Sequence, residues 1–315
     1  MRFNKERSFS NIITSLAAPI LHSRLTLNSL DSWKIGNRYI VERKPYDGGM
    51  SSVYKAWDKF MKRFVAVKTV QPGYKERFSS SIKKEAQTMA NINHSGIPRV
   101  YDYIVTNTPD GEMPLMIMEY LEEENLEQHL KSKKLIQTAE LIEIINQVSG
   151  VVDYMDKSSG HQLYHGDLKP SNIFLRKPHI KLIDFGSSTA VSEGGKEYDE
   201  DFSAPERMRY GLRNTATEEY SLAVIAYYMI TGKVIYFNPG KPDKQVFKKI
   251  SKRNLKYNLS EPDIDLLNKL FEKALSYQPE NRFESALSFA EKFATIFKSA
   301  KIKENGASFL SKIVG

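Results

Sequence analysis

Residues 165–172 read His-Gly-Asp-Leu-Lys-Pro-Ser-Asn, and a short β-like run at 173–175 follows them directly. A second β-like run at 180–183 leads into Asp-Phe-Gly at 184–186. Both polar clusters adjoin apolar segments, although a hydrophobic core has no use for such side chains. Because proteins often carry functional side chains on loops that a rigid scaffold positions, we expect the chemistry of this chain to lie in these two clusters.

The chain on either side of residue 119 differs in periodicity. Before it, short β-like runs dominate, with three strands predicted between 39 and 70, a helix at 75–92, and further strands at 100–105 and 114–118. After it, apolar residues recur at helical spacing in 126–130, 139–155, 217–230, 263–275 and 284–297. The predicted fold class is therefore α+β, with a small antiparallel β lobe that carries one helix and a larger, mainly α-helical lobe.

This pattern also predicts the domain organisation. We expect an N-terminal extension over 1–38, one folded domain over 39–298 and a basic C-terminal tail over 299–315. Within the domain, the first lobe is expected to span 39–118, a connecting hinge 119–121 and the second lobe 122–298.

Composition excludes several classes of protein. The chain has 315 residues, 41% of them hydrophobic, which is enough for a sizeable core. Its 46 Lys and Arg exceed 38 Asp and Glu, and this moderate basicity suits a nucleotide, an acidic substrate, nucleic acid or an anionic membrane equally. The absence of cysteine excludes disulfides, zinc–thiolate sites and thiol nucleophiles, and agrees with a reducing compartment. No apolar stretch reaches the roughly 20 residues of a membrane-spanning helix, so we expect a soluble, cytoplasmic protein.

Both ends of the chain leave alternatives open. Arg2, Lys5 and Arg7 precede a short apolar run at 12–21, which faintly resembles a targeting peptide or an interfacial helix. A mobile extension explains the same residues. The lysines and apolar residues of 298–314 form either a segment that contacts an anionic membrane or a partner, or a solvated tail. No nucleic-acid-binding signature is present, so specific nucleic-acid binding is not expected.

The segment 165–172 is similar to the catalytic loop of protein kinases at every functional position but one, and the motif that begins at Asp184 resembles their magnesium-binding motif. The resemblance implies that Asp167 orients the substrate hydroxyl and accepts its proton. Lys169 would neutralise the transferring phosphoryl group. Asn172 and Asp184 would bind Mg²⁺, with Mn²⁺ as an alternative, through the oxygen ligands that such ions prefer.

The same resemblance implies a nucleotide site in the first lobe. Val-Ala-Val-Lys at 65–68 is similar to the kinase strand whose lysine binds the α and β phosphates of ATP, and Glu85 would hold Lys68 in place. The run 115–121 resembles the hinge that binds adenine through its backbone. Residues expected to contact ATP are Tyr46, Asp47, Gly48, Gly49, Met50, Ser51, Val53, Ala66, Lys68, Glu119, Leu121 and Phe174.

The resemblance covers about residues 39–297, and its details are similar to bacterial members of the eukaryotic-type Ser/Thr protein kinases. It implies a bilobal fold that transfers the γ-phosphoryl group of ATP to a protein hydroxyl. Lys169 favours Ser/Thr over Tyr acceptors, because Tyr kinases usually place a different residue there. Glu206, in Ala-Pro-Glu at 204–206, and Arg282 would form an ion pair within the second lobe.

The sequence departs from the family pattern at several positions. Tyr46 and Ser51 replace two glycines of the nucleotide loop, which puts the ATP affinity in doubt. Gly166 replaces the usual arginine before the catalytic aspartate, so we expect activity that does not depend on phosphorylation of the activation loop. Asp199 replaces a common threonine, and Glu218 replaces an aspartate.

The acidic run at 197–201 is expected to attract basic residues that flank the target hydroxyl. Two alternative functions stay open: a catalytically weak or silent nucleotide-binding scaffold, and a small-molecule phosphotransferase. A silent scaffold typically loses Lys68, Asp167 or Asp184, and all three are present. Small-molecule relatives generally lack Ala-Pro-Glu and Lys169, and both are present here.

Overall fold

The computed structural model describes residues 32–47, 51–71, 75–108, 111–132, 135–158, 163–185, 199–235 and 248–313. The predicted nucleotide-loop residues Gly48, Gly49 and Met50 lie outside these ranges, as does Gly186. The chain divides into two compact units. The first unit contains the chain up to Asn93 together with Pro98–Glu122, and the second contains His94–Ile97 and the chain from Glu123 onward.

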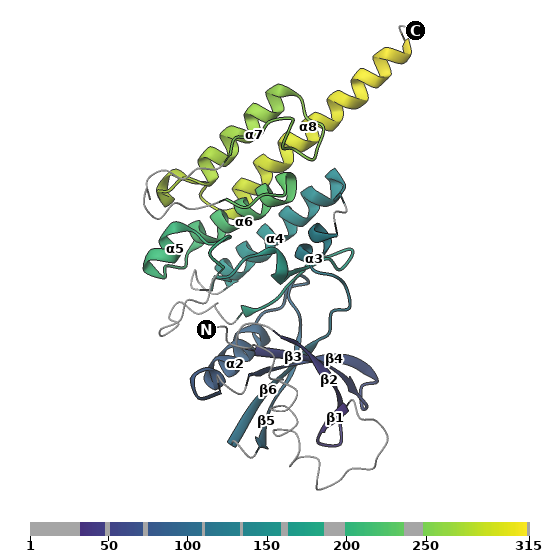
Figure 1. The fold of residues 1–315 in the computed structure, drawn as a ribbon, viewed down its shortest axis with the longest axis vertical. Helices are drawn as coiled ribbons and strands as arrows, with labels where there is room; N and C mark the ends of the chain where they lie inside the picture. The colour runs from purple at the N-terminus through teal and green to yellow at the C-terminus, as the bar shows by residue number, and fades with distance from the viewer. Residues whose placement is uncertain are drawn as a thin grey trace, which may run out of the picture. The chain divides into compact units, whose positions relative to one another are not determined.

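The first unit is built on one antiparallel sheet of six strands in the order β1-β2-β3-β4-β6-β5 (Figure 1). The strands are β1 (Ser32–Ile35), β2 (Tyr39–Asp47), β3 (Ser51–Asp58), β4 (Arg63–Val70), β5 (Val100–Thr108) and β6 (Gly111–Glu119). The five predicted strands are confirmed. The structure adds β1, which the sequence placed in an extension and which pairs with the beginning of β2.

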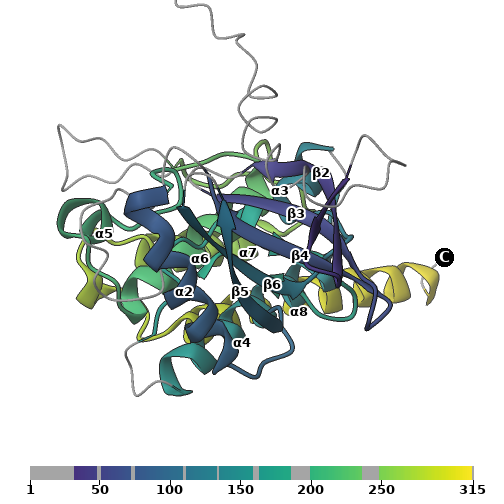
Figure 2. The same ribbon diagram turned by 90° about the horizontal axis from the view of Figure 1, so that it is seen from below.

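Side chains alternate between the two faces of this sheet, as they must in a strand. Val65 and Val67 lie in a core cluster with Val41 and Leu115 on one face. Lys68 follows Val67 and therefore points to the opposite face. The predicted helix is confirmed as α2 (Lys75–Ala90), which packs against β4, β5 and β6 (Figure 2).

The second unit is mainly helical. Its elements are α3 (Leu126–Lys131), α4 (Thr138–Ser158), η2 (Pro170–Asn172), β7 (Ile173–Phe174), β8 (Lys181–Leu182), α5 (Pro205–Tyr210), α6 (Thr215–Thr231), α7 (Glu261–Ala274), η4 (Pro279–Asn281) and α8 (Ala286–Ile313). All five predicted helices and both short β runs are present. The predicted α+β class is thus confirmed, while α8 continues through much of the segment predicted as a tail.

Helix α6 forms the centre of the second unit. Almost all of its residues are buried, and it contacts α4, α7 and α8 (Figure 1). A helix that is apolar on nearly all sides needs such neighbours. It begins at a capping box between Asn214 and Thr217, and it ends at Gly232, whose φ of 72° favours glycine. Within the described residues, no helix is both long and apolar enough to span a membrane.

Candidate active site

Lys68 and Glu85 form a buried ion pair in the first unit. The Lys68 Nζ lies 2.7 and 2.8 Å from the two carboxylate oxygens of Glu85. Both residues are buried, and a buried charge is tolerated only when it is paired. The pairing predicted from sequence order is therefore confirmed, and it fixes the ammonium group on the α2 side of the sheet.

The predicted adenine contacts Val53 and Ala66 share the sheet face of Lys68. Val53 lies opposite Lys68 in the β3–β4 register, and Ala66 precedes Lys68 by two residues. The face thus combines small apolar side chains with one fixed cation, a combination that can accept a flat ring and a nearby anion.

Other predicted nucleotide contacts are spread along the same unit. Tyr46 is exposed at the end of β2, and Ser51 begins β3. Glu119 ends β6, where its N–H donates to the Arg99 carbonyl and its carboxylate accepts from the Arg99 N–H. Leu121 follows the strand and is half-buried. The two remaining contacts are Asp47, which ends β2, and Phe174, which lies in β7 of the second unit.

The second unit gathers polar groups around Asp167. Its Oδ2 lies 2.8 Å from the Lys169 Nζ and accepts from the Asn172 Nδ2 at 3.3 Å. Its Oδ1 accepts from the Asp199 N–H at 3.2 Å. Asn172 also donates to the Asp167 carbonyl at 2.9 Å. Donors from Lys169, Asn172 and Asp199 therefore orient one carboxylate. The contact from Asp199 brings a residue far along the chain into this site.

The charge state of Asp167 depends on opposing effects. Burial raises the pKa of Asp167, the Lys169 ammonium and the Asp199 N–H lower it, and the carboxylate of Asp184 raises it, with a net value of about 6. Burial lowers the pKa of Lys169, but the carboxylates of Asp167, Asp199 and Asp184 outweigh it and raise the pKa overall. A carboxyl group with a pKa near 6 can exchange a proton close to neutral pH, as general acid–base chemistry needs.

His165 connects this loop to the segment that ends at Asp184. The His165 Nε2 lies 2.9 Å from the Ile183 carbonyl oxygen, which can only accept, so Nε2 carries the hydrogen. The Nδ1 accepts from the Asp167 N–H at 3.3 Å. The ring also packs edge-on against Phe185 at 5.0 Å. These contacts bring the two polar clusters of the sequence together.

Gly166 occupies a turn that favours glycine. Its φ is 76°, and its N–H donates to the Glu218 Oε1 at 2.8 Å. Burial raises the pKa of Glu218 to about 7, although the Gly166 N–H and the guanidinium groups of Arg207 and Arg213 lower it. The two departures from the family pattern at 166 and 218 therefore meet in one hydrogen bond that anchors the loop from α6.

Oxygen atoms of Asn172 and Asp184 suit a hard divalent cation. Because Asn172 Nδ2 bonds to Asp167, its amide oxygen is directed elsewhere and makes no hydrogen bond among the described residues. Asp184 is close enough to Asp167 to raise its pKa. In the described ranges no three His, Asp or Glu side chains form a closed metal cage. Mg²⁺ commonly uses one or two protein oxygens and completes its shell with phosphates and water, so the residues fit that ion.

Glu206 and Arg282 form the predicted ion pair, which is buried. The Arg282 Nη1 and Nη2 donate to the two Glu206 carboxylate oxygens at 2.7 and 2.8 Å. Arg282 also donates to the carbonyls of Ser276 and Ala216 and lies over the Tyr220 ring, 4.8 Å from its centroid. The pair ties the first turn of α5 to the loop after η4 and to α6.

Glu219 is a buried acid that the sequence reading missed. It is fully buried in α6, and neither carboxylate oxygen has a hydrogen-bond partner among the described residues. Burial raises the pKa of Glu219 to about 9; Arg282 lowers it, and Glu206 raises it. Helical periodicity could not reveal this residue, because α6 is buried on nearly every side.

Replacing Glu219 by glutamine is expected to stabilise the protein above pH 5. The folded protein keeps this carboxyl protonated up to about pH 9, whereas the unfolded chain releases the proton above the ordinary pKa of 4.5. Stability therefore falls as pH rises through that window, and the neutral Glu219→Gln variant should gain about 3 kcal/mol at pH 7. Urea unfolding at pH 5 and pH 7 measures the effect. Glu291→Gln, an exposed control, should change little, and a Glu219→Gln variant with the parent's pH dependence would contradict the prediction.

Comparison with known proteins places the chain among kinases. The family model described as "Protein kinase domain" matches residues 39–293. A protein named a probable serine/threonine-protein kinase in Clostridium perfringens is 31% identical over 262 residues, which cover 80% of this chain and 37% of the relative. PknB of Mycolicibacterium smegmatis is 28% identical over 255 residues, with coverage of 76% and 40%. PrkC of Bacillus subtilis is 25% identical over 288 residues, with coverage of 86% and 42%. The chain thus spans about 40% of the length of these relatives.

Proposed function

Because the chain belongs to the protein kinase domain family, we propose that it transfers the γ-phosphoryl group of ATP to a Ser or Thr hydroxyl of a protein. The observation that carries the proposal is the Asp167 carboxylate, held by donors from Lys169, Asn172 and Asp199. Relatives named serine/threonine-protein kinases support it. Both partners of the Lys68–Glu85 pair are retained, which favours an active enzyme over a silent scaffold.

In this proposal each residue has one task. Asp167 orients the acceptor hydroxyl and takes up its proton as the O–P bond forms, while the bond to the departing ADP oxygen breaks. Lys169 lies beside Asp167 and stabilises negative charge on the transferring group. Lys68, held by Glu85, binds the α and β phosphates, and the sheet face with Val53 and Ala66 accepts the adenine. A Mg²⁺ or Mn²⁺ ion held by Asn172 and Asp184 would neutralise phosphate charge.

We include phosphorylation-independent activity in the proposal. Gly166 offers no cation to a phosphorylated activation segment, and the nearby Arg207 and Arg213 are buried beside Glu218. Contact of the basic terminal segments with an anionic membrane or a partner stays a prediction, as does a cytoplasmic location. The residues 1–31 and the side chains beyond 299 lie outside the described part of the chain.

Incubation with labelled ATP, Mg²⁺ and a generic basic protein tests the proposal. The parent should place label on Ser or Thr, identified by phosphoamino-acid analysis. Lys68→Met should lose most of this activity, because the Glu85 carboxylate loses the Lys68 ammonium and the phosphates lose their cation. Lys62→Met, in the exposed turn between β3 and β4, is the matched control and should retain activity. Absence of label with the freshly purified, folded parent would refute the proposed function.

A further inference from the structure

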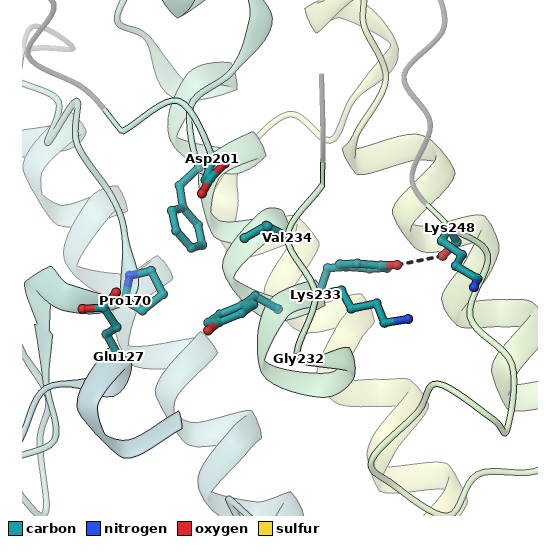
Figure 3. A pocket seen from close by; sticks show the side chains of 10 residues that line it. Glu127, Pro170, Asp201, Gly232, Lys233, Val234 and Lys248 are labelled. Atoms are coloured by element: carbon teal, nitrogen blue, oxygen red, sulfur yellow. Dashed lines mark hydrogen bonds between the residues drawn. The ribbon is translucent and has the colours of Figure 1, made fainter. Parts of the chain in front are cut away.

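A cavity of about 590 Å³ lies in the second unit, close to the Asp167 loop (Figure 3). Its walls come from α3, the beginning of η2, the segment that follows Asp199, the end of α6 with the residues after it, and Lys248. Pro170 contributes to the wall and directly follows Lys169. Two of the segments that line the cavity are therefore the ones that hold the Asp167 carboxylate.

Hydrogen bonds connect one wall of the cavity to Asp167. The Asp199 N–H donates to the Asp167 Oδ1 at 3.2 Å, and the Asp199 Oδ1 accepts from the Asp201 N–H at 3.1 Å. Asp201 itself lines the cavity. The segment that donates to the Asp167 carboxylate therefore runs directly into a wall of the cavity.

Acidic side chains lie on the wall formed by the two segments that hold Asp167. Glu127 and Asp201 lie on the side of Pro170 in Figure 3. Glu127 is half-buried, and its Oε1 lies 3.0 Å from the Lys131 Nζ. The Asp201 carboxylate is exposed and has no ion pair among the described residues. Burial and the carboxylates of Asp199 and Glu200 raise the pKa of Asp201, which places it in a negative field. This wall suits a cationic side chain.

Basic side chains mark the opposite wall. Lys233 and Lys248 lie across the cavity from Pro170 in Figure 3, and both are exposed. Neither ammonium group has an ion pair within the described ranges. The Lys248 backbone is fixed, because its carbonyl accepts from the Tyr227 hydroxyl at 2.8 Å. This wall suits an anionic side chain.

Apolar and aromatic side chains lie between the two charged walls. Val234 lies there in Figure 3, and the rings of Phe202 and Tyr228, which meet edge-on at 5.9 Å, also line the cavity. Aromatic rings offer large contact areas with little rotamer freedom to lose. The middle of the cavity therefore suits an aliphatic or aromatic side chain.

We infer that the cavity selects protein substrates by the order of charge along the segment that carries the Ser or Thr. The preferred segment has a cationic side chain nearest the acceptor hydroxyl, then an apolar or aromatic side chain, then an anionic side chain farthest away. This inference rests on the proposed function and adds to it a substrate class. The acidic run at 197–201 explains only the contact with the cationic side chain of the substrate. Lys233 and Lys248 add a contact with its anionic side chain.

Two sets of peptides of identical composition test the inference. In the first set Lys, Phe and Glu stand at increasing distances from the acceptor Ser, and in the second set Lys and Glu exchange places. Each set contains one peptide with these residues N-terminal to the Ser and one with them C-terminal to it. The better peptide of the first set should have a kcat/KM about tenfold above its counterpart, the size expected when two exposed charge contacts change from attraction to repulsion.

Variants of the basic wall assign this preference to the cavity. The double variant Lys233→Glu, Lys248→Glu should remove most of the tenfold preference, because the anionic end of the peptide then meets like charge. Lys292→Glu, which changes an exposed lysine of α8, should leave it unchanged. Equal kcat/KM for the two peptide sets, or a preference that the double variant retains, would overturn the inference. Transfer to the generic basic protein would in that case still support the proposed function. No transfer to any acceptor would overturn both.

Discussion

Replacing Asp167 by asparagine should lower kcat by about a thousandfold, a loss within the range seen when a positioned general base is removed. Asparagine preserves the shape of the side chain, but its amide cannot take up the proton of the acceptor hydroxyl. Lys169 contacts the Asp167 Oδ2 and the Asp199 N–H donates to the Oδ1, so an NH₂ group in place of either oxygen removes one of these contacts. Steady-state phosphate transfer to the generic basic protein measures the effect.

Two further measurements separate chemistry from folding in this variant. The thermal unfolding midpoint should stay close to that of the parent, because burial already raises the pKa of Asp167 to about 6 and a neutral side chain is tolerated there. Asp265→Asn, on the exposed side of α7, is the matched control and should keep full activity. If folded Asp167→Asn protein retains more than a tenth of the parent kcat, Asp167 is not the general base.

Replacing Arg282 by alanine should destabilise the second unit by about 3–5 kcal/mol, because the Glu206 carboxylate is then buried without its partner. The loss adds to that of the hydrogen bonds to the Ser276 and Ala216 carbonyls. Urea unfolding of the full chain, followed by far-UV circular dichroism, measures the change. Arg253→Ala, an exposed change in the same unit, should cost little.

A double-mutant cycle tests whether the ion pair itself causes this loss. The variant with both Glu206→Met and Arg282→Met should be less destabilised than the sum of the single changes, because no unpaired charge remains. Additive effects of the two changes, or an Arg282→Ala variant as stable as Arg253→Ala, would show that the pair does not hold the first turn of α5 in place.

Much of the candidate site could be predicted because its residues lie close together in the sequence or follow a recognisable order. Asp167, Lys169 and Asn172 come from one loop, and their mutual contacts are local. The Lys68–Glu85 and Glu206–Arg282 pairs were predicted from motif order alone, and both are present. The kinase family match bears out the predicted fold and function class.

Features that depend on packing could not be predicted. The strand β1 has only four residues, and its pairing with β2 rather than its own pattern makes it a strand. Glu219 looks like an ordinary polar helix residue until the neighbours of α6 bury it. The charged walls of the cavity join Glu127, Asp201 and Lys248, which are far apart in the sequence and carry no shared motif.

The turn at Gly166 limits which residues can occupy this position without strain. A glycine reaches φ of 76° without the penalty of about 1–2 kcal/mol that other residues meet in left-handed conformations. The loop therefore needs less help from its surroundings to stay in this shape. A side chain at position 166 would add this cost to the loop that the Glu218 carboxylate anchors.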